Sequence, residues 1–284
     1  MTYEKASTVN QKHIVRSCAI ITDTHIGSDY APWPLEAIKT RLGKNLSKGI
    51  SNDQKKLTRN LKNFAGIMDE FQVDTVFHLG DIIQGTNYKD AGAETVTPEI
   101  EWQKEAAEML LAPMIEDRTL HMVSGSGYHQ SLDTKVHKDM ARRFHDYNCK
   151  ANYYGPVRNI KLTGTSKIIN IGHAPSSASA NLGSVMEREY INMKVGQATG
   201  TIPKVDCVIR GHLHKYRHID FSDMHIIQAP GWQAWYPLKG AASGYGKWQP
   251  NIGGVIYMID EWDRTIILHF LYDAPHIASK MVVG

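Results

Sequence analysis

The sequence predicts an α/β fold in which two mixed β-sheets pack face to face with helices on the outside, a four-layer α/β/β/α sandwich. In the first half of the chain, short apolar runs rich in Ile and Val alternate with segments of helical periodicity. In the second half, pairs of short apolar runs are separated by turn residues, which is typical of hairpins. Strands joined first by helices and then by hairpins indicate two sheets that cover one another.

The first half contains three expected strands and three expected helices. The strands are expected at residues 13–22, 74–79 and 119–123. The helices are expected at residues 53–71, 97–115 and 132–147. Apolar residues from Leu57 to Phe71 recur at helical spacing, and Thr97 followed by Pro98 is a typical helix start.

The second half is expected to form the other sheet. Hairpins are expected at residues 157–171 and 217–228, a helix at 186–195 and a strand at 205–210. The last strands, within residues 253–271, are expected to complete the second sheet. We expect residues 1–284 to form a single domain, with a motif-bearing core at about 14–230.

Composition excludes several classes of protein. Hydrophobic residues make up 42% of the 284 residues and charged residues 21%, which argues against disorder. No apolar run approaches the roughly 18–20 residues that a membrane span needs, and no small-residue cleavage site follows the first apolar stretch. Three cysteines are too few and too scattered for a disulfide framework. We therefore expect a cytoplasmic protein that makes no membrane contact.

Positive charge is concentrated in one stretch of the chain. Between Lys39 and Lys62 there are eight basic residues and one acidic residue, Asp53. This stretch is a candidate surface for an anionic partner. A solvated helix face is the alternative interpretation.

Five short segments with metal-ligand side chains each follow an apolar run. They are Asp23-Thr24-His25, Gly80-Asp81, Gly127-Tyr128-His129, Gly172-His173 and Gly211-His212-Leu213-His214. Alone, each segment has an ordinary turn as its alternative. Together they supply two carboxylates and five imidazoles at strand ends, where open α/β sheets bind ligands. The set indicates a centre for two metal ions and hence a hydrolase.

In this order the segments resemble the motifs of the calcineurin-like metallophosphoesterase superfamily. Its pattern is Asp-x-His, Gly-Asp, Gly-Asn-His followed by an acid, a lone Gly-His, and Gly-His-x-His. The resemblance covers residues 18 to about 230. It implies the metallophosphoesterase sandwich fold and the hydrolysis of phosphate esters.

The resemblance also implies roles for individual residues. Asp23, His25, Asp81 and His214 would hold one divalent ion, and Asp81, His173 and His212 the other, so that Asp81 bridges the pair. A hydroxide between the ions would attack the phosphate. His129 would act as general acid or stabilise the transition state. Carboxylate and imidazole ligands suit Mn, the expected metal, with Fe, Zn or Ni as alternatives.

One motif departs from the family pattern. Tyr128 stands in the place of the Asn that ligates the second ion, and Gln130 replaces the acid that follows. Neutral tyrosine is a poor ligand, so either Tyr128 binds as phenolate, or water or Ser126 completes the site, or the second site is weak. We favour a weak or water-completed site. An alternative alignment puts Gly125-Ser126 in the Gly-Asn place.

Three functions are compatible with these residues. The first is a phosphodiesterase, including nuclease activity, on nucleic acid or a nucleotide, favoured by the basic stretch and by Trp232 and Trp235, whose exposed rings would stack on bases. The second is a phosphomonoesterase for a small metabolite or phosphoprotein. The third is a metal-binding scaffold without turnover. Tyr128 and Gln84 are further candidate substrate contacts. A turn-capping amide is the alternative for Gln84, and burial in the core or in a homo-oligomer interface is the alternative for the tryptophans.

Overall fold

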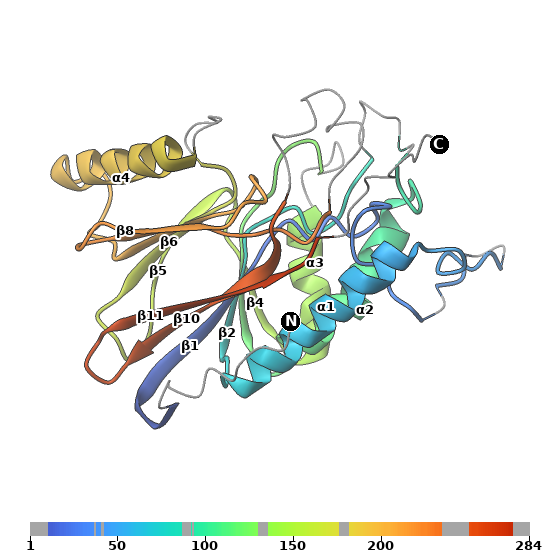
Figure 1. Ribbon diagram of the computed structural model, residues 1–284, viewed down its shortest axis with the longest axis horizontal. Coiled ribbons are helices and arrows are strands. Elements are labelled where there is room, and N and C mark those ends of the chain that lie inside the picture. Colours follow the sequence, from blue (N-terminus) through green and yellow to red (C-terminus); the bar gives the residue numbers. More distant parts are fainter. Residues whose placement is uncertain are drawn as a thin grey trace, which may run out of the picture.

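The computed structural model describes residues 11–36, 38–40, 43–86, 92, 94–129, 136–175, 182–234 and 250–274. Two β-sheets lie face to face at the centre of the molecule (Figure 1). Helices α1, α2 and α3 pack against the outer face of the first sheet, and α4 packs against the outer face of the second. The predicted four-layer sandwich is therefore confirmed.

The first sheet contains six strands in the order β11-β10-β1-β2-β3-β4. Strands β1 to β4 are parallel to one another, whereas β10 is antiparallel to β1 and β11 is antiparallel to β10. The strands are β1 (Ile14–Ile21), β2 (Thr75–His78), β3 (Thr119–Met122), β4 (Lys150–Tyr153), β10 (Ile252–Asp260) and β11 (Thr265–Tyr272). Strand β4 was not predicted, because its sequence contains no apolar run.

The C-terminal strands do not complete the second sheet, which corrects the expectation from the sequence. They extend the first sheet, and Cys18 of β1 pairs with Tyr257 of β10. Every residue of β10 is buried. Ile256 and Met258 face the helices, whereas Val255 faces the second sheet. A strand that is apolar on both faces needs cover on both sides, and the position beside β1 provides it.

The second sheet contains five strands in the order β5-β6-β7-β9-β8. Both predicted hairpins are present, as the antiparallel pairs β5–β6 and β8–β9. Strand β7 lies between them and is parallel to both β6 and β9. The strands are β5 (Val157–Lys161), β6 (Ile168–Gly172), β7 (Cys207–Arg210), β8 (Arg217–Asp220) and β9 (His225–Gln228).

Four helices cover the two sheets in the described part of the chain. They are α1 (Asn52–Glu70), α2 (Ile100–Ile115), α3 (Val136–Phe144) and α4 (Leu182–Ala198). Helix α1 begins with a capping box, in which Ser51 and Gln54 bond each other's backbone N–H. Helix α2 begins later than predicted, after Glu99. Thr97 lies before it and accepts the Glu99 N–H at its side-chain oxygen, so it orders the preceding loop.

Three apolar layers hold the sandwich together. The largest lies between the first sheet and its helices and includes Phe64, Leu111 and Met140. The second lies between the two sheets, and the third lies beneath α4. All three cysteines are free and buried. Within the described residues, no helix is both long and apolar enough to cross a membrane.

This topology determines where the loops meet. Because β1, β2 and β3 are parallel, the loops that follow them leave the first sheet at the same edge. Strands β6 and β7 are also parallel, so the loops that follow them leave the second sheet together. All five loops carry the motifs that the sequence analysis identified.

Candidate metal centre

The five motif-bearing loops bring their polar side chains into one cluster. Ligand atoms form three overlapping groups, and within each group the atoms lie within 4.8 Å of one another. The groups are Asp23 with His25 and His214, His25 with Asp81 and His129, and Asp81 with His173 and His212. Segments that are far apart in the sequence therefore converge as the motif order predicts. The roles of these residues as metal ligands remain a prediction.

Five of these side chains stand on backbone in the left-handed region. Asp23, His25, Asp81, His212 and His214 have φ between 41° and 73°. Non-glycine residues rarely adopt such angles, and each costs on the order of 1–3 kcal/mol unless the surrounding structure imposes it. Such residues concentrate at functional sites. The tight turns direct consecutive side chains of each loop toward one point.

Backbone hydrogen bonds between the loops impose these turns. The N–H of Asp23 donates to Gly80 O at 3.1 Å, and the N–H of His25 donates to Asp81 O at 3.0 Å. The N–H of Gly211 donates to His173 O at 2.8 Å, which joins the two loops of the second sheet. The His212 N–H donates to Asp23 Oδ2 at 2.8 Å and so connects the two sheets.

Asp81 lies at the centre of the cluster. Its Oδ2 is 3.0 Å from His173 Nε2 and 4.0 Å from His25 Nε2. Its carboxylate therefore faces ligands from both proposed ion sites. On the other side, Asp23 Oδ1 is 3.2 Å from His214 Nε2 and 3.6 Å from His25 Nε2. The sharing of Asp81 between two ions stays a prediction.

Both carboxylates are ionised although they are buried. Burial alone would raise the pKa of Asp23, but His214 and His173 outweigh it and hold the pKa well below its ordinary value. Burial likewise opposes ionisation of Asp81, and His173 and His129 lower its pKa well below the usual range. Two buried negative charges in one cluster require nearby positive charge.

The histidines respond to this charge in different ways. Burial lowers the pKa of His25 to about 3, so its imidazole is neutral. Burial also lowers the pKa of His212, with a further decrease from His173. His173 is the exception, because Asp81 and Asp23 outweigh its burial and raise its pKa to about 9. A neutral imidazole is the form that ligates a metal ion.

The cluster fits divalent metal ions. Among the described residues, the buried Asp23 Oδ1 has no hydrogen-bond partner. The nearest ring nitrogens of His25 and His214 lie 3.2 Å apart, as do those of His173 and His212. Ligand atoms roughly 3.3 Å apart surround a tetrahedral ion whose bonds are about 2.0–2.1 Å long. The oxygen and nitrogen donors also suit borderline transition metals.

Ser126 contacts Asp81, the carboxylate proposed to bridge the two ions. The Ser126 N–H donates to Asp81 Oδ1 at 2.8 Å, and its hydroxyl lies 3.1 Å from Oδ2. Tyr128 is 55% exposed. The geometry therefore favours the alignment that puts Gly125-Ser126 in the Gly-Asn place, with His129 displaced by two residues. Gln130 lies outside the described residues.

His129 nevertheless reaches the cluster. It is buried, and its ring meets the ring of His25 edge-on with centroids 4.3 Å apart. Its Nδ1 donates to the backbone carbonyl of Gln84 at 2.8 Å, which fixes the orientation of the ring. The Gln84 side chain is itself buried and accepts a hydrogen bond from Gln233. Gln84 therefore orders the loop beneath His129, and its amide is not exposed to a substrate.

Trp232 does not offer a stacking surface, which corrects a second expectation. Its ring is fully buried and packs against Phe64 and Tyr272. The ring belongs to the apolar layer between the first sheet and its helices, where burial of its large apolar area is favourable. Trp235, the other proposed stacking residue, lies outside the described residues.

Sequence reasoning missed His78, which connects two ligand loops. His78 Nδ1 accepts the Gly80 N–H at 3.3 Å, so the ring carries its proton on Nε2. That nitrogen lies 3.3 Å from Thr24 Oγ1, which donates its own proton to Ile82 O at 2.8 Å. Burial lowers the pKa of His78 to about 3 and keeps it neutral. Its signal was a histidine at the last position of an apolar strand, two residues before Gly80.

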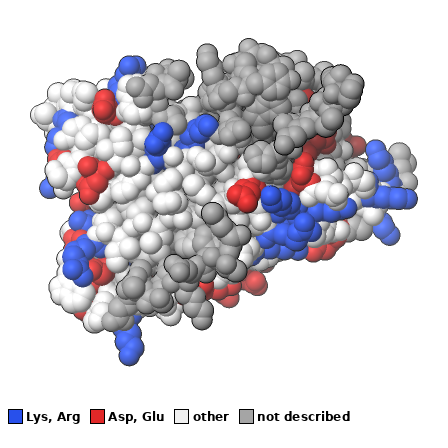
Figure 2. All heavy atoms as spheres, in the orientation of Figure 1, with Lys and Arg blue, Asp and Glu red and all other residues white. Residues whose placement is uncertain are grey.

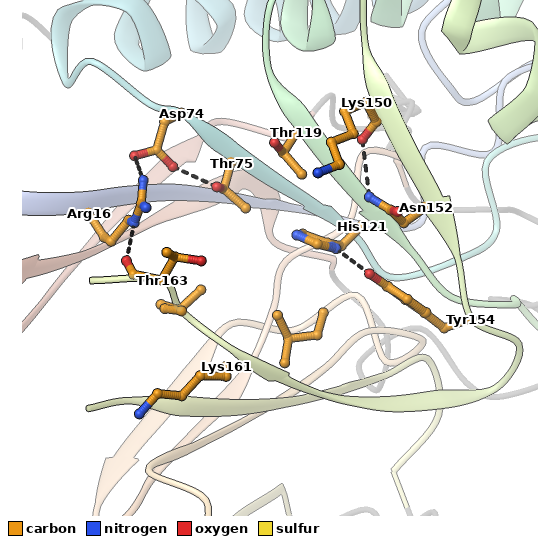
Figure 3. Close-up of a pocket in the computed structure, with 12 residues that line it drawn as sticks. Arg16, Asp74, Thr75, Thr119, His121, Lys150, Asn152, Tyr154, Lys161 and Thr163 are labelled. Carbon is orange, nitrogen blue, oxygen red and sulfur yellow. Dashed lines mark hydrogen bonds and ion pairs between the residues drawn. The ribbon is translucent and has the colours of Figure 1, made fainter. Parts of the chain in front are cut away.

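A polar cavity of about 340 Å³ lies at the opposite ends of the strands (Figure 3). It is bounded by the first residues of β2 and β3 and by the end of β5. Arg16 bonds both Asp74 and the carbonyl of Thr163 there, which joins the two sheets. His121 bonds the Tyr154 hydroxyl at 2.7 Å. None of the predicted metal ligands lines this cavity.

Comparisons with known proteins find similarity in structure only. No protein-family model matches the chain, and no curated protein matches its sequence. A dimetal phosphatase from Danio rerio aligns over 90% of this chain and 96% of its own, with 13% identity and a TM-score of 0.49. An archaeal phosphodiesterase aligns over 89% and 99%, with 14% identity and a TM-score of 0.42.

A zinc-bound Vps29 from Entamoeba histolytica aligns over 90% of this chain and 99% of its own, with 13% identity and a TM-score of 0.39. Within the two-sheet sandwich, the Asp-x-His, Gly-Asp, Gly-His and Gly-His-x-His segments converge in the order by which the sequence resembles the calcineurin-like metallophosphoesterase superfamily.

Proposed function

We propose that this protein is a metal-dependent phosphodiesterase that hydrolyses nucleic acid or a nucleotide. The single observation that supports this most strongly is the convergence of two ionised, buried carboxylates with five histidines at the edge of the sandwich. A cluster with this charge and these donor atoms suits two cations and a phosphate-ester substrate. The buried free cysteines accord with a cytoplasmic location.

Each residue of the cluster has a defined part in the proposed reaction. Asp23, His25, Asp81 and His214 would hold one ion, and Asp81, His173 and His212 the other. When bound, such ions lower the pKa of a water molecule and neutralise phosphate charge.

His129 would supply the proton that the leaving oxygen requires. Its Nδ1–H is committed to the carbonyl of Gln84, so the proton that it exchanges is carried on Nε2.

We propose Mn as the metal, with Fe, Zn or Ni as alternatives, and a second site that binds its ion more weakly than the first. The weak site has three side-chain ligands in the cluster, Asp81, His173 and His212. Ser126 occupies the place beside Asp81, and a neutral hydroxyl is a weaker ligand than the amide oxygen that the family pattern has there. Water would complete this site.

Turnover of two chromogenic esters with added Mn tests the proposal. Hydrolysis of bis-p-nitrophenyl phosphate without hydrolysis of p-nitrophenyl phosphate supports the phosphodiesterase. Hydrolysis of the monoester alone would indicate a phosphomonoesterase. Absence of both activities in protein that retains metal would indicate a scaffold without turnover.

A further inference from the structure

One surface of the molecule is strongly basic. It is formed by α1 and the segment before it, and we call it the basic surface. Figure 2 shows blue side chains gathered over α1 and over the segment that projects beside it. The residues of the basic surface are Lys39, Lys44, Lys48, Lys55, Lys56, Arg59 and Lys62.

The side chains of the basic surface are not engaged in holding the fold together. In the described part of the chain, Lys62 is the only one of the seven that forms an ion pair, at 3.1 Å from Glu36 on the surface. Lys55, Arg59 and Lys62 follow i, i+4, i+7 spacing and lie opposite the buried stripe of α1. Their positions span about 10 Å of helix axis. Phosphates of one strand of a duplex recur about every 3.4 Å along the helix axis, so this stripe reaches about three of them.

The basic surface begins beside the metal centre. Helix α1 connects the parallel strands β1 and β2, so its N-terminus lies at the edge where the ligand loops leave the first sheet. Gln54 in the first turn of α1 donates to the carbonyl of Ser28, three residues after His25. Lys55 and Lys56 follow directly, and Arg59 and Lys62 lead away along the helix.

We propose that the basic surface binds the phosphate backbone of a nucleic acid and leads that strand into the metal centre. The inference rests on the proposed phosphodiesterase function and selects a polynucleotide, not a free nucleotide, as substrate. An anionic membrane is less suited to this surface, because surface-bound helices insert an apolar face and the apolar face of α1 is buried against the sheet. No large hydrophobic side chain is exposed among the described residues from 38 to 62.

Charge reversal tests the proposal. The test variant is Lys48→Glu/Lys55→Glu/Arg59→Glu, and the control with the same change in net charge is Arg188→Glu/Lys204→Glu/Arg217→Glu, at exposed positions on the second-sheet side. With Mn and a single-stranded oligonucleotide, the test variant should raise KM at least tenfold with kcat unchanged. Each phosphate contact on a single strand contributes roughly 0.7 to the slope of log KM against log salt. Loss of three contacts should therefore lower this slope by about 2. Turnover of bis-p-nitrophenyl phosphate should equal that of the wild type.

Several results would overturn the proposal. An equal rise in KM for the control variant would show that net charge causes the effect. An unchanged KM for the test variant would show that the basic surface does not bind the substrate. Vesicles containing phosphatidylserine that bind the wild type but not the test variant, with no effect on the oligonucleotide, would reassign the surface to membranes. If the wild type hydrolyses neither substrate, the proposed function fails. Fluorescence anisotropy of a labelled oligonucleotide then measures whether the basic surface binds nucleic acid, independently of activity.

Discussion

Gly125 provides a test of how the bridging carboxylate is held. It lies in the loop after β3, where the backbone passes directly over Asp81. A Cβ at this position would lie 1.9 Å from Asp81 Oδ1 and 2.4 Å from Asp81 N. Neither Gly125 nor Gly127 has φ in the left-handed region, so the backbone of both accepts alanine. Gly125→Ala therefore perturbs Asp81 by steric contact alone.

The size of the effect follows from the distances. An ordinary contact begins at 3.4 Å, so the Asp81 carboxylate must move by roughly 1.5 Å and its backbone N by roughly 1 Å. That movement lengthens the 2.8 Å hydrogen bond from Ser126 N–H, and a bond to a charged group contributes about 1.5–3 kcal/mol. Misplacement of a catalytic group by about 1 Å can cost about 10²-fold in rate. We expect Gly125→Ala to lose about 10²-fold in turnover and at least one equivalent of metal.

Gly127→Ala is the matched control, because a Cβ there meets no atom within 4 Å. Turnover of bis-p-nitrophenyl phosphate, metal content after gel filtration and thermal unfolding are measured for both variants. We expect the control to match the wild type in all three. The reasoning would be refuted if Gly125→Ala retained the wild-type turnover and metal content, or if both variants lost them equally.

Asp81→Asn should abolish turnover and metal retention together, because it removes the carboxylate common to both ligand sets; retained metal on elemental analysis would contradict this. His129→Gln should lower turnover about 10²–10⁴-fold and leave metal content intact, and full activity on an ester with a poor leaving group would show that its role is wrong. Extensive dialysis should remove one ion easily and leave the other, whereas two ions at full occupancy would count against a weak second site. Burial lowers the pKa of His137 from 6.5 to about 4, so the unfolded chain takes up a proton between these values and the free energy of unfolding falls as pH drops. This histidine should cost the wild type about 2 kcal/mol between pH 7 and pH 5, and urea unfolding of His137→Leu should lack that loss; equal pH dependence in the two proteins would refute it.

The sequence by itself determined the local features. Apolar runs placed β1, β2 and β3 nearly at their observed bounds, and turn residues placed both hairpins of the second sheet. The metal-ligand motifs are also local, since each is a short segment at or within a few residues of the end of a strand. Each motif is recognised from the apolar residues that precede it in the chain. A short window of sequence is therefore sufficient to find it.

Only the tertiary structure decided which strands pair and which side chains meet. Strand β10 is apolar on both faces and would suit either sheet, and its pairing with β1 depends on contacts more than 200 residues apart. Trp232 has an aromatic ring that could stack on a base, but this ring is buried against Phe64 and Tyr272. Ser126 contacts Asp81 because the whole loop after β3 passes over that carboxylate, a path that no short window of sequence specifies. Such contacts depend on backbone geometry between distant segments, which residue type alone does not specify.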